Sequence, residues 1–124
     1  MSEKIRWNVT ARVDAGPVLE AADAIDADAY DKLEVTIPDG ANKQPINIAP
    51  VKWPSVLFLA LNPRKTSPSL NYDLNGTKIP IDGPHFLVGS GAVKLLGTGD
   101  ATLKFSNTSG ADATIDILVG RNAS

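Results

Sequence analysis

The chain contains no cysteine and a single histidine among its 124 residues. Without cysteine it has no disulfide framework, no thiolate metal site and no cysteine nucleophile. Because His85 is the only imidazole, a metal centre built from several histidines is excluded, and a catalytic triad has no second candidate base. We therefore interpret His85 as a loop or core-edge residue that takes no part in catalysis.

Long apolar runs and targeting signals are also missing. The longest apolar run, residues 56–61, has six residues, far short of the roughly 20 that a membrane-spanning helix needs. The chain begins Met-Ser-Glu-Lys-Ile-Arg, which contains no apolar core of a secretory signal. These features predict a protein that is made and folded in the cytoplasm and has no membrane partner.

Common catalytic and nucleotide-binding motifs are absent. The Gly-Ser-Gly segment 89–91 is not a nucleophile elbow, because Val88 stands where the elbow needs a glycine. The Gly-Thr-Gly segment 97–99 is followed by Thr102 where a dinucleotide fingerprint needs a third glycine, and no Gly-Lys-Ser/Thr phosphate loop exists. We therefore expect neither an enzyme nor a cofactor, with a hydrolase as the last-ranked alternative.

Charge is unevenly distributed along the chain. The net charge is −2, but residues 1–39 hold nine acids and four bases, whereas residues 40–124 hold five acids and eight bases. The adjacent basic pair Arg64 and Lys65 lies in a Pro/Ser loop, without the basic stripe and interleaved aromatics of nucleic-acid binders, so we expect no nucleic-acid partner. The asymmetry fits head-to-tail contact between copies, but two differently solvated ends of one sandwich are the favoured interpretation.

What the sequence does contain is alternation with a period of two. Ile5, Trp7 and Val9 alternate with polar residues, and residues 33–37 repeat the pattern. Such alternation predicts strands with one buried face. Ten glycines and nine prolines mark frequent turns. We predict an all-β fold, an antiparallel β-sandwich or jelly roll of about eight to ten short strands, in one domain over residues 1–124, with at most one or two short helical turns.

Three segments carry more specific predictions. In residues 101–119, apolar and polar residues alternate on both sides of a polar turn at Gly110. This pattern predicts a hairpin. Residues 56–61 are apolar on both faces, as in a strand covered on each side by the sandwich or by a neighbouring subunit. Asn75-Gly76 predicts a tight hairpin, and Pro80 places its second arm at a sheet edge or bulge.

Two further segments are ambiguous. Residues 18–29 combine alanines typical of a short helix with a position between two strands, which favours an extended edge segment. Residues 92–96 fit either a turn of helix or a short strand.

Four aspartates form the one constellation that resembles a metal site: Asp23, Asp26, Asp28 and Asp31. Carboxylates on a loop supply the oxygen ligands that Ca²⁺ prefers, but the spacing lacks the glycine and distal glutamate of an EF-hand. The alternative is a solvated acidic edge that discourages sheet-to-sheet aggregation. The acidic-edge interpretation is favoured over a calcium site.

Aromatic residues make up only 6% of the chain. Trp7, Trp53, Tyr30 and Tyr72 would form a sugar-stacking platform if they were exposed together. Packing in the core or at a subunit interface is favoured over sugar binding, since Trp7 already fits the apolar face of its strand.

Several stretches together resemble small accessory structural proteins of tailed phages and phage-like particles. They read Ala-Tyr-Asp-Lys-Leu-Glu-Val-Thr-Ile-Pro at residues 29–38, Gly-Pro-His-Phe-Leu-Val-Gly-Ser-Gly-Ala-Val-Lys-Leu-Leu-Gly at 83–97, and Ala-Thr-Ile-Asp-Ile-Leu-Val-Gly-Arg at 113–121. The resemblance spans residues 29–121 and carries no site residues. It implies a non-enzymatic β-sandwich that decorates a capsid or joins a tail, in many symmetric copies.

We therefore expect a capsid decoration (cement) subunit that is located on the virion and binds neighbouring virion subunits as a homo-oligomer. A carbohydrate-binding or adhesion module and a tail or baseplate protein are the alternatives. Candidate contact regions are the loops 62–69 and 89–91 and the N-terminal segment. The candidate interface residues are Arg64, Lys65, Trp53 and Ser90.

Overall fold

The structure is a computed structural model that describes residues 2–123. Almost all of its regular structure is β, which confirms the predicted fold class. The strands are β1 (Glu3–Arg12), β2 (Val18–Ala27), β3 (Ala29–Ile37), β4 (Gln44–Lys52), β5 (Val56–Pro63), β6 (Ser67–Leu74), β7 (Thr77–Ile81), β8 (His85–Val88), β9 (Asp100–Asn107) and β10 (Ala113–Arg121). The helical elements are the short helix α1 (Ser90–Val93) and the 3₁₀ turns Trp53–Ser55 and Lys94–Leu96.

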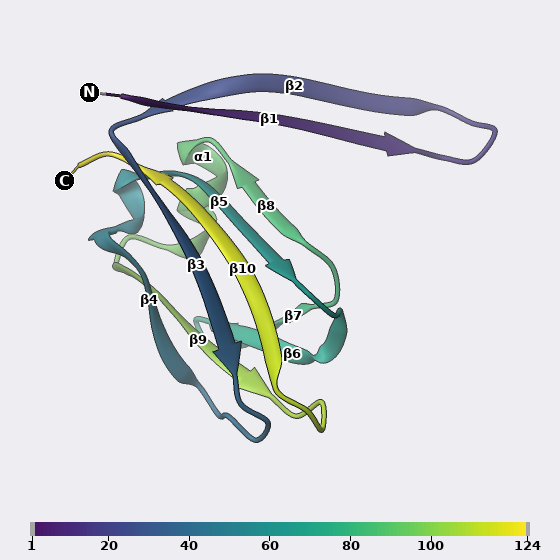
Figure 1. Ribbon diagram of the computed structural model, residues 1–124, viewed down its shortest axis with the longest axis vertical. Coiled ribbons are helices and arrows are strands. Elements are labelled where there is room, and N and C mark those ends of the chain that lie inside the picture. Colours follow the sequence, from purple (N-terminus) through teal and green to yellow (C-terminus); the bar gives the residue numbers. More distant parts are fainter. Residues whose placement is uncertain (1, 124) are drawn as a thin grey trace.

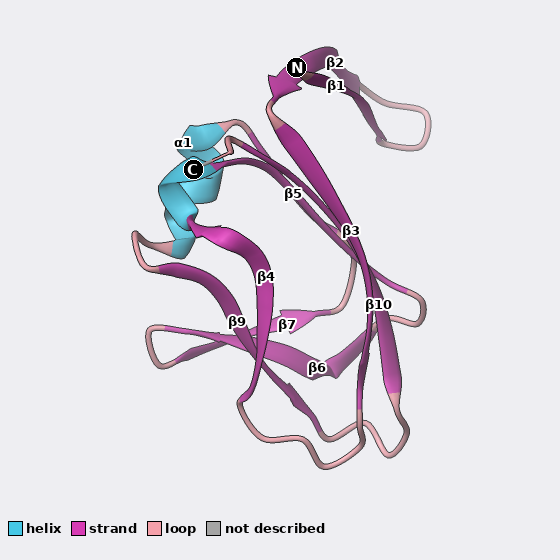
Figure 2. Ribbon diagram, turned by 60° about the vertical axis from the view of Figure 1, so that its left-hand side comes forward, coloured by secondary structure: helices cyan, strands magenta, loops and turns pink. Residues whose placement is uncertain are grey.

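Strands β3 to β10 form two four-stranded antiparallel sheets that face each other (Figure 2). One sheet has the order β3-β10-β5-β8 and the other the order β4-β9-β6-β7. Within this sandwich, β6 and β7 are consecutive in the chain and adjacent in one sheet. All the other connections between consecutive strands, from β3 to β10, pass from one sheet to the other. This strand order is that of an eight-stranded jelly roll, one of the two architectures that the sequence predicts.

The core lies between the two sheets and is built by the alternation of the strands. On β10, Ile117 stands opposite Leu33 of β3 and Leu61 of β5, so that all three side chains share the inner side of their sheet. Phe105 of β9 is fully buried on the facing sheet. The largest fully buried side chains are Phe105, Ile37, Ile48, Leu59, Leu61, Leu70, Ile81, Ile115, Ile117, Val56, Val93 and Val119.

The predicted hairpin over residues 101–119 is wrong. β9 pairs with β4 and β6, whereas β10 pairs with β3 and β5 in the other sheet. The two strands therefore face each other across the core. Alternation shows that each strand buries one face, but it does not distinguish lateral pairing from packing face to face.

The side chain of Asn107 holds this crossing between the sheets. It is fully buried, and its Nδ2 donates to the carbonyl oxygens of Ile37 at 3.0 Å and Ala111 at 2.8 Å. Its Oδ1 accepts hydrogen bonds from the amide and the hydroxyl of Ser109 at 3.0 and 2.7 Å. Gly110 completes the turn with φ 92°, a conformation that glycine adopts without steric cost.

Other local predictions are confirmed. β6 and β7 form a hairpin around Asn75-Gly76, whose φ angles of 51° and 85° belong to the predicted tight turn. β7, which contains Pro80, is an edge strand. Residues 18–27 are extended, as favoured, and the helical alternative holds for residues 92–96.

The first two strands leave the sandwich. β1 and β2 pair only with each other, in an unbroken register of ten residue pairs, and make a separate two-stranded sheet. Figure 1 shows this hairpin crossing one end of the sandwich and projecting well beyond it. We call residues 3–27 the arm.

Replacing Asn107 with alanine should lower the free energy of unfolding by about 2–4 kcal/mol, because the buried carbonyl of Ile37 loses its donor and the turn loses three further hydrogen bonds. Chemical denaturation followed by circular dichroism measures the loss. Asn62→Ala, on the exposed side of β5, is the matched control and should change stability by less than about 0.5 kcal/mol. Equal losses in the two variants would contradict the role assigned to Asn107.

Candidate functional site

The arm is held to the sandwich by a small apolar cluster of its own. Ile5 and Ala27 are buried against Phe58 and Ala60, which lie on the outer side of β5. The partly buried residues packed around this cluster are Trp7, Ile25, Leu57, Val88 and Leu118. The arm thus covers the second apolar face of β5 that the sequence predicts, and a segment of the same chain supplies the cover.

Gly120 of β10 makes room for this contact. A methyl group added at Gly120 would overlap Ile5 Cδ1 and lie 3.4 Å from Phe58 Cβ. The absence of a side chain therefore lets Ile5 seat directly on the sheet.

The connection between arm and sandwich is tied to the C-terminal segment. Asp28, between β2 and β3, donates its amide hydrogen to the carbonyl of Arg121 at 3.0 Å. Its carboxylate accepts a hydrogen bond from the amide of Ala123 at 2.9 Å. Asp31 Oδ2 lies 2.7 Å from Arg121 Nε in a largely shielded ion pair. These contacts fix the direction in which the arm leaves the body.

One face of the arm stays apolar beyond the sandwich. Cross-strand partners share a face, so Val9 with Ala21 and Ala11 with Leu19 continue the side on which Ile5 and Ile25 pack. We call these four residues, Val9, Ala11, Leu19 and Ala21, the distal inner face. All four are exposed, with Val9 at 38% and Leu19 at 63% of their accessible surface.

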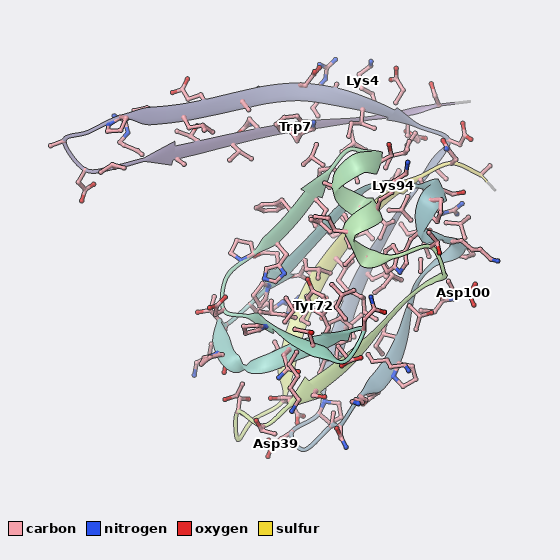
Figure 3. The ribbon with its side chains drawn as sticks, turned by 180° about the vertical axis from the view of Figure 1, so that it is seen from behind. Lys4, Trp7, Asp39, Tyr72, Lys94 and Asp100 are labelled. Atoms are coloured by element: carbon pink, nitrogen blue, oxygen red, sulfur yellow. The ribbon has the colours of Figure 1, made fainter. Side chains whose placement is uncertain are left out.

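Further exposed apolar side chains lie at the tip of the arm and beside it. Val13 and Val18 at the tip of the arm are 62% and 42% exposed, and Phe86 of the edge strand β8 is 51% exposed. Trp7, Val9 and Phe86 line a notch of about 230 Å³ between the arm and β8. Figure 3 shows Trp7 on β1, with the arm continuing past it away from the sandwich. Among residues 2–123, five of the seven exposed large hydrophobic side chains therefore lie on or beside the arm.

Trp7 Nε1 is the one buried side-chain nitrogen or oxygen atom without a hydrogen-bond partner in the described residues 2–123. An unpaired buried indole N–H costs free energy, so its position is set by the packing of the ring.

The four interface candidates fall in different places. Trp53 is 3% exposed and belongs to the core between the sheets, so it does not contact a neighbour in this fold. Lys65 and Ser90 are exposed. Arg64 is exposed but already bound within the chain, with NH2 2.9 Å from Glu34 Oε2 and Nε 3.2 Å from Asp116 Oδ2.

The electrostatics of Arg64 follow from these contacts. The hydrogen bond and charge of Asp116, helped by Glu34, raise the pKa of the guanidinium above its usual value. Arg64 therefore stays charged and cross-links the outer sides of β3 and β10.

The four aspartates have separate partners. Asp26 forms an ion pair with Lys4 at 3.0 Å, and Asp28 and Asp31 bind the C-terminal segment as described. Asp23 accepts a hydrogen bond from the amide of Ala24 and stands opposite Trp7. No three carboxylate or imidazole groups gather as a metal site in the part of the chain that the structure describes.

The aromatic residues do not assemble a sugar platform. Trp53 and Tyr72 are buried in the core, whereas Tyr30 is exposed on β3. Tyr72 packs edge-on against Phe105, and its hydroxyl lies 3.0 Å from His85 Nδ1. His85 is thus a core-edge residue, as predicted from its place in the sequence, and it links β8 to the facing strand β6.

The chain matches no protein-family model, and no curated protein or solved structure matches it either. No helix within residues 2–123 is long and apolar enough to cross a bilayer. Among the surfaces described, the arm is therefore the candidate functional site.

Replacing Gly120 with valine should release the arm while the sandwich stays folded, because the new side chain occupies the seat of Ile5. We expect the two indole N–H signals in the NMR spectrum to respond differently. The Trp7 signal should shift and exchange faster with solvent, whereas the Trp53 signal should be unchanged. Gly83→Val, at a position with open space around it, is the matched control. Unchanged Trp7 protection in Gly120→Val would contradict this anchoring.

Burial raises the pKa of the Tyr72 phenol above its usual value. The folded state therefore favours the neutral phenol, so the contribution of this group to stability is complete below about pH 10 and is lost as the pH rises further. We expect Tyr72→Phe to lower the free energy of unfolding by about 1 kcal/mol at neutral pH, because the hydrogen bond to His85 is lost. Above about pH 10, the stability of the variant should fall less with rising pH than that of the parent chain. Denaturation curves at neutral and alkaline pH test this; parallel losses in both proteins would contradict it.

Proposed function

We propose that this chain is a non-enzymatic structural protein of a phage or phage-like particle, a capsid decoration subunit that binds neighbouring subunits. The observation that carries the proposal is the arm, whose apolar face continues into solvent beyond the sandwich. Large contiguous apolar patches on soluble proteins mark surfaces that bind something.

The design of the arm supports an adhesive role. Its proximal half is fixed to the sandwich by Ile5 and Ala27, and its distal half carries Val9 and Leu19 outward in a set direction. A surface whose strands are already paired loses less conformational entropy on binding than an unstructured segment would. Such a contact gains strength when many copies engage at once, as on a symmetric particle.

The jelly-roll order of the sandwich is compatible with this role, because viral capsid domains are among the proteins that use it. Lectin domains use the same architecture, so fold alone does not select between the two. The burial of Trp53 and Tyr72 leaves the sugar-binding alternative without its stacking platform.

The proposal is tested by looking for the protein on particles. Particles purified from a producing host by density gradient should contain the full chain in many copies per capsid, and heads separated from tails should retain it. Protein found in soluble fractions alone would contradict the proposal. Protein found with the tails alone would replace decoration with a tail role.

The contribution of the arm is tested on particles that lack the protein. Purified parent chain added back should bind them, whereas Leu19→Glu should bind at least about tenfold more weakly, because a charge enters the apolar face. The matched control is Thr10→Glu, which adds the same charge on the opposite face of the arm. Equal binding by Leu19→Glu and the parent chain would show that the arm is not the binding surface.

A further inference from the structure

We propose that the arm and the edge of β8 together form a binding site for one extended peptide segment of a neighbouring subunit, which adds to β8 as a fifth, antiparallel strand of its sheet. The inference deepens the structural role proposed above, and only the identity of the partner as a particle subunit rests on that role. The experiments below use a peptide and no particle, so the two proposals fail separately.

β8 is an edge strand that turns part of its backbone away from its sheet. It is the last strand in the order β3-β10-β5-β8 and, in the described part of the chain, it pairs with β5 alone. The amide of Gly89 donates to the carbonyl of Leu57 at 2.8 Å, which shows which backbone groups face β5. Because these groups alternate along an antiparallel strand, Leu87 also directs its amide and carbonyl at β5, whereas Phe86 and Val88 direct theirs outward. The edge thus offers two donors and two acceptors to a further strand.

The arm crosses the outer side of this sheet toward the same edge. Ile5 lies against Gly120 of β10 and Phe58 of β5. Further along β1, Trp7 and Val9 border the notch at β8. β1 therefore passes over β10, β5 and β8 in the order in which they lie in the sheet, and Figure 1 shows the arm continuing past β8.

The distal inner face overhangs the position next to β8. Val9 lies at the notch, and Ala11 is two residues, or roughly 7 Å, further along the arm. Neighbouring strands of a sheet are only about 4.8 Å apart, so Ala11 and its cross-strand partner Leu19 stand over the place that a fifth strand would take. That strand would pack its apolar side chains under the distal inner face, whose residues are all exposed in the free chain.

The notch between the arm and β8 accepts one bulky side chain of the added strand. Val88 stands opposite Phe58, on the side of the sheet where the arm packs, and Phe86 shares that side. Together with Trp7 they line the notch of about 230 Å³, which is larger than the roughly 150 Å³ cavity that holds a benzene ring. A residue added directly opposite Phe86 or Val88 places its own side chain on this side as well.

These features together fit a polypeptide in extended conformation. Such a chain repeats a donor, an acceptor and a side chain on one face every two residues, which matches the spacing of Phe86 and Val88. In antiparallel pairing, the residues that exchange hydrogen bonds with Phe86 and Val88 are also those whose side chains face the arm. A small apolar molecule would fill the notch but leave these backbone groups unpaired. The segment therefore alternates apolar residues, which face the arm, with polar residues, which face away from it.

The contact is short. Pro84 precedes β8 and Gly89, with φ 92°, follows it, so the edge spans four residues. We therefore expect an isolated peptide to bind with a Kd of about 0.1–1 mM. Stable attachment then needs many copies that engage at once, as on a symmetric particle. The shortness of the edge also limits its pairing with unrelated sheets.

A peptide titration followed by NMR tests the site. The probe is a capped synthetic peptide of about seven residues that alternates valine with threonine and ends in glutamate for solubility. It should shift the amide signals of Phe86 and Val88, slow their exchange with solvent, and shift the indole signal of Trp7, whereas the indole signal of Trp53 in the core stays unchanged. The same peptide with N-methylated valines lacks the amide hydrogens that face β8 and should bind at least about tenfold more weakly. Equal binding by the two peptides, or no shift at about 5 mM peptide, would overturn the proposal.

Two substitutions at one position separate the backbone from the side chain. Val88→Pro removes an outward amide hydrogen, a change that an edge strand tolerates, and should lower the affinity for the peptide at least about tenfold. Val88→Ala keeps the amide and should bind within about threefold of the parent chain. An unchanged Trp53 indole signal shows that both variants are folded. Equal affinities of Val88→Pro and Val88→Ala would overturn strand addition.

The overhanging face is tested with the same peptide. Leu19→Glu places a charge above the added strand and should weaken peptide binding at least about tenfold. Thr10→Glu adds the same charge on the opposite face of the arm and should bind like the parent chain. Equal binding by Leu19→Glu and the parent chain would overturn the assignment of the arm to this site. A peptide that binds as described to a protein absent from particles would support this site and contradict the proposed function alone.

Discussion

The packing of Ile5 and Ala27 on the outer side of β5 is the contact on which the arrangement of the molecule depends. β5 is apolar on both faces, and the facing sheet covers only one of them. Phe58 and Ala60 on the other face need a cover, which the proximal half of the arm supplies. Because the hairpin keeps an unbroken register and is longer than the surface it covers, the remainder projects into solvent. The exposed apolar face of the arm is thus a by-product of covering the outer side of β5.

Strand positions could be predicted well from the sequence, because alternation directly reports which face of a strand is buried. Tight turns could also be predicted where one conformation demands particular residues, as Asn75-Gly76 does. Pairing could not. The connection after β9 contains only local turn residues, and nothing in its composition shows that the side chain of Asn107 reaches Ile37, far away in the sequence. A tertiary hydrogen bond stabilises the crossing between the sheets there.

The candidate site could be predicted only in part. The N-terminal segment and its apolar alternation indicate a contact region, but single residues such as Trp53 do not reveal whether they lie in the core or on the surface. The four aspartates Asp23, Asp26, Asp28 and Asp31 likewise do not reveal their surroundings from the sequence. Asp26 and Asp28 are close in sequence, yet they serve different neighbours, because the chain turns from the arm into the sandwich between them. Residue type left a calcium site open as the less favoured interpretation, whereas the structure gives each carboxylate a partner of its own.

The bonds of Asp28 to the C-terminal segment, and the pairing of Glu3 with Ala27, place the two described ends of the chain at one side of the molecule, opposite the tip of the arm (Figure 1). A peptide or reporter domain fused to either end would therefore stand clear of the tip. The ends of the chain can therefore be extended without covering the projecting hairpin.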